Sequence, residues 1–172
     1  GWNTLHQISA ILIKIGISQN FISYLFVFTS AISLLCGLYL ILYSLTDYKL
    51  FSIIVAIIFF IIQKHFGHVD YPTLTTSEHT YGLFTFSLFT LILGLLSQRN
   101  FKFAGFVSTI LLGFHLVAGA WVISIILSIL IFSILLKKDN NLIFKRILLG
   151  FSLGLFLIFI SLVFFYLNTI PK

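Results

Sequence analysis

The chain has 172 residues, of which 60% are hydrophobic and 8% are charged, and its net charge at pH 7 is +6. Its mean hydropathy is +1.17, whereas a soluble domain carries about 25% charged residues. The composition therefore excludes an ordinary soluble domain and predicts an all-α, polytopic integral membrane protein, with a single transmembrane domain over residues 1–172. The apolar runs are continuous rather than alternating, which favours helical spans. We expect the basic residues to contact phospholipid headgroups, and we expect no nucleic-acid partner.

Residues 4–17 have the periodicity of an amphipathic helix. Leu5, Ile8, Ile11, Leu12 and Ile15 recur at helical spacing, which places them on one face. This pattern predicts a short N-terminal helix in the membrane interface. The alternative is that the segment is only the lead-in to the first span.

Five apolar runs follow, separated by polar turns, and they predict about five transmembrane helices. We expect spans over 21–46, 50–63, 81–96, 103–136 and 147–167. The run over 103–136 would be roughly 50 Å long as one helix, at 1.5 Å of rise per residue. Since two full spans need about 40 apolar residues, we expect one tilted helix there.

Five spans place the two termini on opposite sides of the membrane. One face would then carry Lys14, Lys64, Lys137, Lys138, Lys145 and Arg146, and the other would carry Lys49, Arg99, Lys102 and Lys172. The excess of basic residues on the first face predicts that the N-terminus lies inside.

His115 is the one ionisable residue within the long apolar run, and such a residue is a functional candidate because burying it in hydrocarbon is costly. Small neighbours, Gly113 and Gly119 among them, would let a helix or a flat cofactor approach closely. His115 could supply one axial ligand of a haem b, with His79 as a second. The alternative is a histidine that is hydrogen-bonded between packed helices.

The connector over 64–80 contains His65, His68, Asp70, Glu78 and His79. Imidazole and carboxylate groups can ligate zinc, copper or iron, so His65, His68 and Asp70 are candidate metal ligands. The alternative is a polar loop whose histidines lie at the level of the lipid headgroups.

Two further features concern packing rather than chemistry. Gly150 and Gly154 form a Gly-x-x-x-Gly pair in the last span, which is typical of close helix packing. Cys36 is the one cysteine, so the chain cannot build a disulfide or a cysteine-ligated cluster, and we expect it to be a small buried side chain. The spans lack the acidic and basic groups that a pump would need, which favours a non-catalytic subunit.

One segment resembles subunit III of the haem–copper cytochrome oxidases. Residues 74–82, Leu-Thr-Thr-Ser-Glu-His-Thr-Tyr-Gly, are similar to a family segment that precedes a transmembrane helix, and Gln63 and Asp70-Tyr71 match loosely upstream. Gly113-Phe114, Ala118 and Trp121 are spaced like the start of the family's final helix, where His115 replaces a glutamate. The family's histidine motif in the third span and its Trp-His-Phe-Val-Asp run are missing, and its first helices have no counterpart here.

The resemblance implies a non-catalytic structural subunit of a membrane respiratory complex. Such a subunit would support the catalytic subunit, bind phospholipids and carry no cofactor of its own, in a mitochondrial inner membrane or a bacterial cytoplasmic membrane. The first alternative is a haem b-binding anchor that exchanges electrons with quinone. The second is a membrane metallohydrolase that uses the connector over 65–79.

Overall fold

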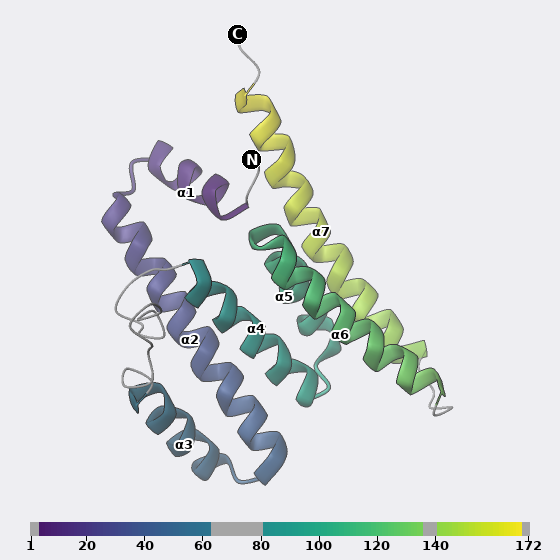
Figure 1. Cartoon of the computed structure of the whole chain (residues 1–172). Coiled ribbons are helices and arrows are strands. Elements are labelled where there is room, and N and C mark those ends of the chain that lie inside the picture. Colours follow the sequence, from purple (N-terminus) through teal and green to yellow (C-terminus); the bar gives the residue numbers. More distant parts are fainter. Residues whose placement is uncertain (1–3, 63–80, 136–140, 170–172) are drawn as a thin grey trace. The chain divides into compact units, whose positions relative to one another are not determined.

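The structure, a computed structural model, describes residues 4–62, 81–135 and 141–169, and its regular structure there is entirely helical (Figure 1). The helices are α1 (Thr4–Lys14), α2 (Gln19–Thr46), α3 (Lys49–Ile62), α4 (Tyr81–Ser97), α5 (Phe101–Phe114), α6 (Leu116–Leu135) and α7 (Asn141–Thr169). The all-α prediction is confirmed. The chain divides into two compact units, one containing α2, α3 and α4 and the other containing α1, α5, α6 and α7. The single membrane domain over 1–172 stays a prediction.

The ends of the first helices follow local signals in the sequence. Gly16 adopts a φ of +91°, and the Gly16 and Ile17 amides bond the carbonyls of Ile13 and Leu12, which is a Schellman ending of α1. The predicted helix over 4–17 is therefore shorter at its C-terminal end. Ser18 caps the start of α2 by accepting a hydrogen bond from the Phe21 amide at 3.3 Å.

In the α2–α4 unit, α2 and α4 run parallel and in close contact. The rings of Phe26 and Phe84 meet edge to face at 5.6 Å, and the Gln98 side chain donates to the Leu40 carbonyl oxygen at 2.9 Å. Between these contacts, an added Cβ at Gly37 would lie 2.6 Å from the Leu91 amide nitrogen. Only glycine fits there. α3 packs on α2. Because α2 and α4 run in the same direction, α3 carries the chain back in the opposite direction before α4 begins.

In the other unit, α5 and α7 also run parallel, and glycines again allow the backbones to approach. An added Cβ at Gly150 would meet the Lys102 carbonyl oxygen and lie 2.8 Å from the Phe106 amide nitrogen. An added Cβ at Gly105 would lie 2.7 Å from the Ile147 carbonyl oxygen. α1 lies against α5 and α7.

The predicted single helix over 103–136 is wrong, because the chain reverses at His115. α5 ends at Phe114 and α6 begins at Leu116. In a continuous helix, residues seven apart lie roughly 10 Å apart, whereas an added Cβ at Gly119 would collide with the Cα of Leu112. The run is therefore a helical hairpin with a one-residue connection, and His115 lies at its tip.

The hairpin also changes where the basic side chains lie. Since α5 and α7 are parallel, Lys102, Lys145 and Arg146 lie at the same end of their unit, where both helices begin. Lys14 lies at the opposite end, where its Nζ is 5.9 Å from the centre of the Phe164 ring. The predicted grouping of Lys14 with Lys145 and Arg146 on one face is wrong, since the five-span topology lacked this reversal.

Candidate functional site

His115 is the N-cap of α6. Its Nδ1 accepts a hydrogen bond from the Ala118 amide at 3.2 Å, three residues further along the chain. Its own amide still donates to the Leu111 carbonyl oxygen at 2.7 Å, and its carbonyl oxygen accepts from the Gly119 amide at 2.8 Å. The side chain is half-buried. The residue thus ends one helix and starts the next, and its ring satisfies one of the amides that every helix start leaves unpaired.

This cap has a consequence for haem binding. A neutral imidazole has one donor and one acceptor nitrogen, so an accepting Nδ1 places the proton on Nε2. A metal-bound histidine instead donates the proton of its other ring nitrogen to a partner and binds the metal with its bare nitrogen. Ligation of haem iron through Nε2 would therefore break the bond to Ala118. The geometry favours a structural role for His115.

The cap predicts a specific ranking of variants at His115. Replacing an N-cap side chain by alanine costs about 1 kcal/mol of stability, whereas asparagine is among the preferred N-caps. We expect His115→Ala to lower the unfolding free energy by about 1 kcal/mol relative to His115→Asn. Thermal unfolding of the two variants in the same detergent measures the difference. Equal stabilities would show that the Ala118 bond contributes nothing.

The structure does not test whether the other predicted ligands lie near His115. His65, His68, Asp70 and His79 belong to the connector, which lies outside the described residues, so their roles in metal or haem binding stay predictions. Within 4–62, 81–135 and 141–169, no three His, Cys, Asp or Glu side chains are grouped so that they could hold a metal ion.

The glycines singled out from the sequence lie at close contacts between helices. An added Cβ at Gly154 would lie 2.5 Å from Thr109 Cβ, and one at Gly113 would lie 2.8 Å from Thr4 Oγ1. Gly150 and Gly119 lie against α5, as described above. Sequence reasoning missed Gly37, Gly94 and Gly105, because each pairs with a helix far away in the sequence rather than with a local repeat.

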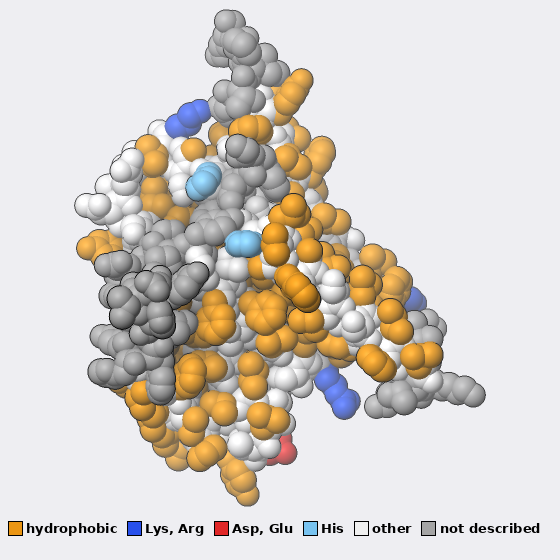
Figure 2. Space-filling view, in the orientation of Figure 1, with side chains coloured by type: hydrophobic (Ala, Val, Ile, Leu, Met, Phe, Trp, Pro, Cys, Tyr) orange, Lys and Arg blue, Asp and Glu red, His pale blue; other side chains and the backbone are white. Residues whose placement is uncertain are grey.

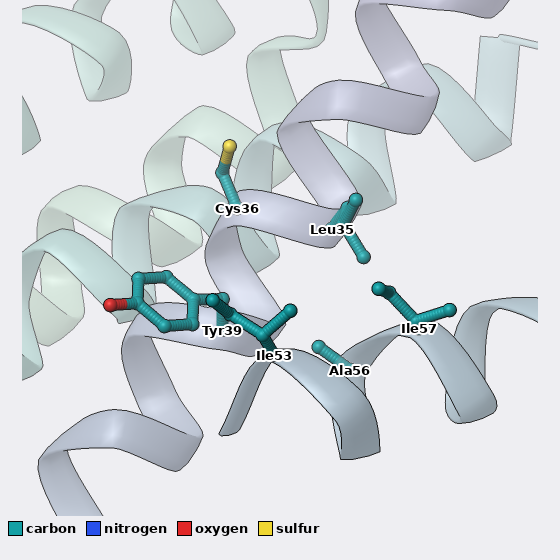
Figure 3. A pocket seen from close by; sticks show the side chains of 6 residues that line it. All are labelled: Leu35, Cys36, Tyr39, Ile53, Ala56 and Ile57. Atoms are coloured by element: carbon teal, nitrogen blue, oxygen red, sulfur yellow. The ribbon is translucent and has the colours of Figure 1, made fainter. Parts of the chain in front are cut away.

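One cavity of about 310 Å³ lies between α2 and α3 (Figure 3). Leu35 and Ile57 face each other across it, and the Cys36 thiol points away from Ile53 and Ala56. Cys36 is exposed on α2, so the prediction that it is buried is wrong. The cavity has no charged side chain in its lining, so it suits only apolar groups.

A second cavity, of about 300 Å³, lies between α1, α5 and α7. Thr4 and Ser161 are the two polar residues in its lining, and the others are apolar. Sequence reasoning missed both residues, because each is singled out only by a buried hydroxyl that has no hydrogen-bond partner among the described residues. Comparisons of this chain with protein-family models, with curated proteins and with solved structures find no match.

Proposed function

We propose that this chain is a non-catalytic, polytopic membrane subunit whose helices pack against lipid and against other membrane subunits of a hetero-oligomeric complex. In this proposal α2 to α7 are embedded in the bilayer and α1 lies at its interface. The hairpin at His115 replaces the fourth of the five predicted spans by two embedded helices.

The observation that carries the proposal is the apolar outer surface of the two longest helices. α2 and α7 are long and apolar enough to cross a membrane, and only 28% and 22% of their most apolar windows are buried. Phe28, Phe156 and Phe159 are each more than 60% exposed. Figure 2 shows hydrophobic side chains over much of the visible described surface, with few charged ones. Soluble monomers rarely expose so much contiguous apolar surface, whereas lipid or a neighbouring helix covers it at no cost.

The distribution of charge within each unit supports the same placement. Lys49 and Arg99 lie at one end of the α2–α4 unit, and Lys102, Lys145 and Arg146 lie at one end of the other, with Lys14 opposite. Basic residues concentrate on the cytoplasmic or matrix side of membrane proteins. Taken separately, each unit is therefore oriented with the end that carries more of its described basic residues inward. This orientation places Lys14 on the outer side and reverses the predicted inside location of the N-terminus.

The oxidase assignment within this proposal rests on the resemblance to subunit III. The resemblance places Gly113-Phe114, Ala118 and Trp121 at the start of one helix, whereas Gly113 and Phe114 end α5 and only Ala118 and Trp121 lie in α6. Residues 74–82, the other part of the resemblance, lie outside the described residues. The haem b anchor is less well supported, because the hydrogen bond from Ala118 to Nδ1 opposes ligation by His115.

The test is the size and composition of the particle that contains the chain in its native membrane. After gentle extraction with a mild detergent, we expect the chain to migrate on a native gel in a complex much larger than its own 19.5 kDa. Mass spectrometry of that band should identify membrane partners, and an oxidase subunit among them would support the narrower assignment. Migration as a lone monomer would contradict the subunit proposal.

A further inference from the structure

Three basic side chains gather at the end of their unit where α5 and α7 begin. Lys102 is the second residue of α5, and Lys145 and Arg146 are the fifth and sixth residues of α7. All three are exposed, and we call them the basic cluster. The described residues of this unit include no aspartate or glutamate, because Asp47, the one acidic residue that the structure describes, belongs to the other unit.

The close packing of α5 on α7 brings cations from the two helices together. An added Cβ at Gly150 would meet the Lys102 carbonyl oxygen, so the backbone of Lys102 lies at the level of Gly150. Arg146 is four residues earlier in α7, about 6 Å nearer the start of that helix. Because Cα–Cβ bonds tilt toward the N-terminus of a helix, the Lys102 side chain leans in the same direction. The glycine contact therefore sets the spacing of the cluster.

The basic cluster has the wrong sign for the ends of the helices on which it lies. The start of a helix carries a partial positive charge, which acidic side chains or bound anions stabilise and cations do not. Neither α5 nor α7 has an acidic residue in its first turn, and Lys102 lies in the first turn of α5. The sequence just before α7 adds no net negative charge, because Asp139 follows Lys137 and Lys138. A bound anion would neutralise the excess positive charge at this end.

The surface next to the basic cluster is apolar. Phe103 follows Lys102 in α5, and Phe144 and Leu148 lie on either side of the two cations in α7. Each of these apolar side chains is more than half exposed. A partner that fits must offer a negative group to the cluster and apolar groups to the surface beside it. An acidic peptide in water offers only the first, whereas an anionic phospholipid offers both within one molecule.

We propose that the basic cluster binds the phosphate of an anionic glycerophospholipid, whose acyl chains lie along the apolar surface beside it. The Arg146 guanidinium supplies a forked pair of donors that matches a phosphate, and the two lysines add compact positive charges. Anionic lipids are concentrated in the cytoplasmic leaflet, which is the side where the proposed orientation places this end. The inference rests on the proposed membrane placement and assigns one class of lipid to one end of this unit.

The test is native mass spectrometry of the full chain released from nanodiscs made of equal parts phosphatidylglycerol and phosphatidylcholine. We expect the chain to retain phosphatidylglycerol in preference to phosphatidylcholine. Lys102→Gln and Arg146→Gln should each reduce this preference about 5-fold, from one lost basic contact. Lys14→Gln removes the same charge at the opposite end of the unit, so it is the matched control and should leave the preference unchanged. An equal loss in Lys14→Gln and Lys102→Gln would overturn the site, because only net charge would then matter.

A second measurement separates a ligand site from a structural role of Lys102. In nanodiscs of phosphatidylcholine alone, Lys102→Gln should unfold at the same temperature as the original chain or higher, because it removes a cation from the positive end of α5. In phosphatidylglycerol the original chain should be the more stable, because a ligand that binds only the folded state stabilises it. A lower unfolding temperature of Lys102→Gln in both lipids would mark the residue as structural and overturn the site.

The remaining outcomes distinguish the lipid site from the proposed function. If the original chain retains both lipids equally but resists extraction by alkaline carbonate, only the lipid site fails. If carbonate extracts the chain, the membrane placement fails as well. If Lys102→Gln and Arg146→Gln leave lipid retention unchanged but release a protein partner from the native complex, the cluster binds an acidic partner and the lipid site is overturned.

Discussion

Gly150→Ala should destabilise the protein by about 1–3 kcal/mol, the range for overpacking a tight contact. The added methyl would meet the Lys102 carbonyl oxygen and lie 2.8 Å from the Phe106 amide nitrogen. Both are backbone atoms of α5 and cannot rotate away as a side chain can. The two parallel helices would have to separate, and the packing of Gly154 against Thr109 would be lost with them. Thermal unfolding in detergent, followed by circular dichroism, measures the effect.

Gly82→Ala is the matched control for this substitution. Gly82 is in the first turn of α4, and an added Cβ there has no neighbour within 4 Å among the described residues. Since alanine favours a helix by up to about 1 kcal/mol over glycine, Gly82→Ala should be neutral or stabilising. The stability of Gly154→Ala should lie between those of Gly150→Ala and Gly82→Ala, because the two atoms nearest to an added Cβ at Gly154 belong to the Thr109 side chain. If Gly150→Ala were as stable as Gly82→Ala, the close approach of α5 and α7 would be wrong.

The limits of α2, α3 and α4 could be predicted from the sequence to within two residues. The run over 21–46 became α2, and the run over 50–63 became α3, each within two residues at either end. Their limits follow local signals: Ser18 is a good N-cap, and Asp47 adopts the left-handed conformation that ends α2. α7 begins earlier than predicted, because Lys145 and Arg146 are helical residues at the end of the apolar run rather than part of the loop.

The hairpin at His115 could not be predicted in the same way. The break contains no proline and no formal charge, and the surrounding residues are as apolar as the helices they join. What decides it is the contact of Gly119 with Leu112, which exists only once the chain has turned. The parallel pairing of α2 with α4 through Gly37 and Gly94 is a long-range contact of the same kind. The sequence therefore predicted helix-forming segments well and their directions poorly.

Cys36 allows a direct test of membrane embedding, because it is the one cysteine in the chain and it is exposed on α2. It lies ten residues before the end of α2 at Thr46, which is roughly 15 Å along the helix axis. In a bilayer with a hydrocarbon core about 30 Å thick, that position is near the middle. An exposed thiol on a helix in water would react freely with a charged maleimide, whereas a thiol that faces lipid is out of reach of the reagent.

The decisive measurement is therefore the labelling of Cys36 by a charged maleimide in permeabilised membranes, where the reagent has access to both aqueous sides. The account predicts almost no labelling until sodium dodecyl sulfate is added, and complete labelling afterwards. The control is the variant Cys36→Ser with Tyr48→Cys, which places the thiol at the exposed turn between α2 and α3, where Tyr48 is 73% exposed; it should label in the permeabilised membranes before sodium dodecyl sulfate is added. Labelling of Cys36 in membranes as fast as this control would contradict the membrane placement of α2, and with it the proposed function.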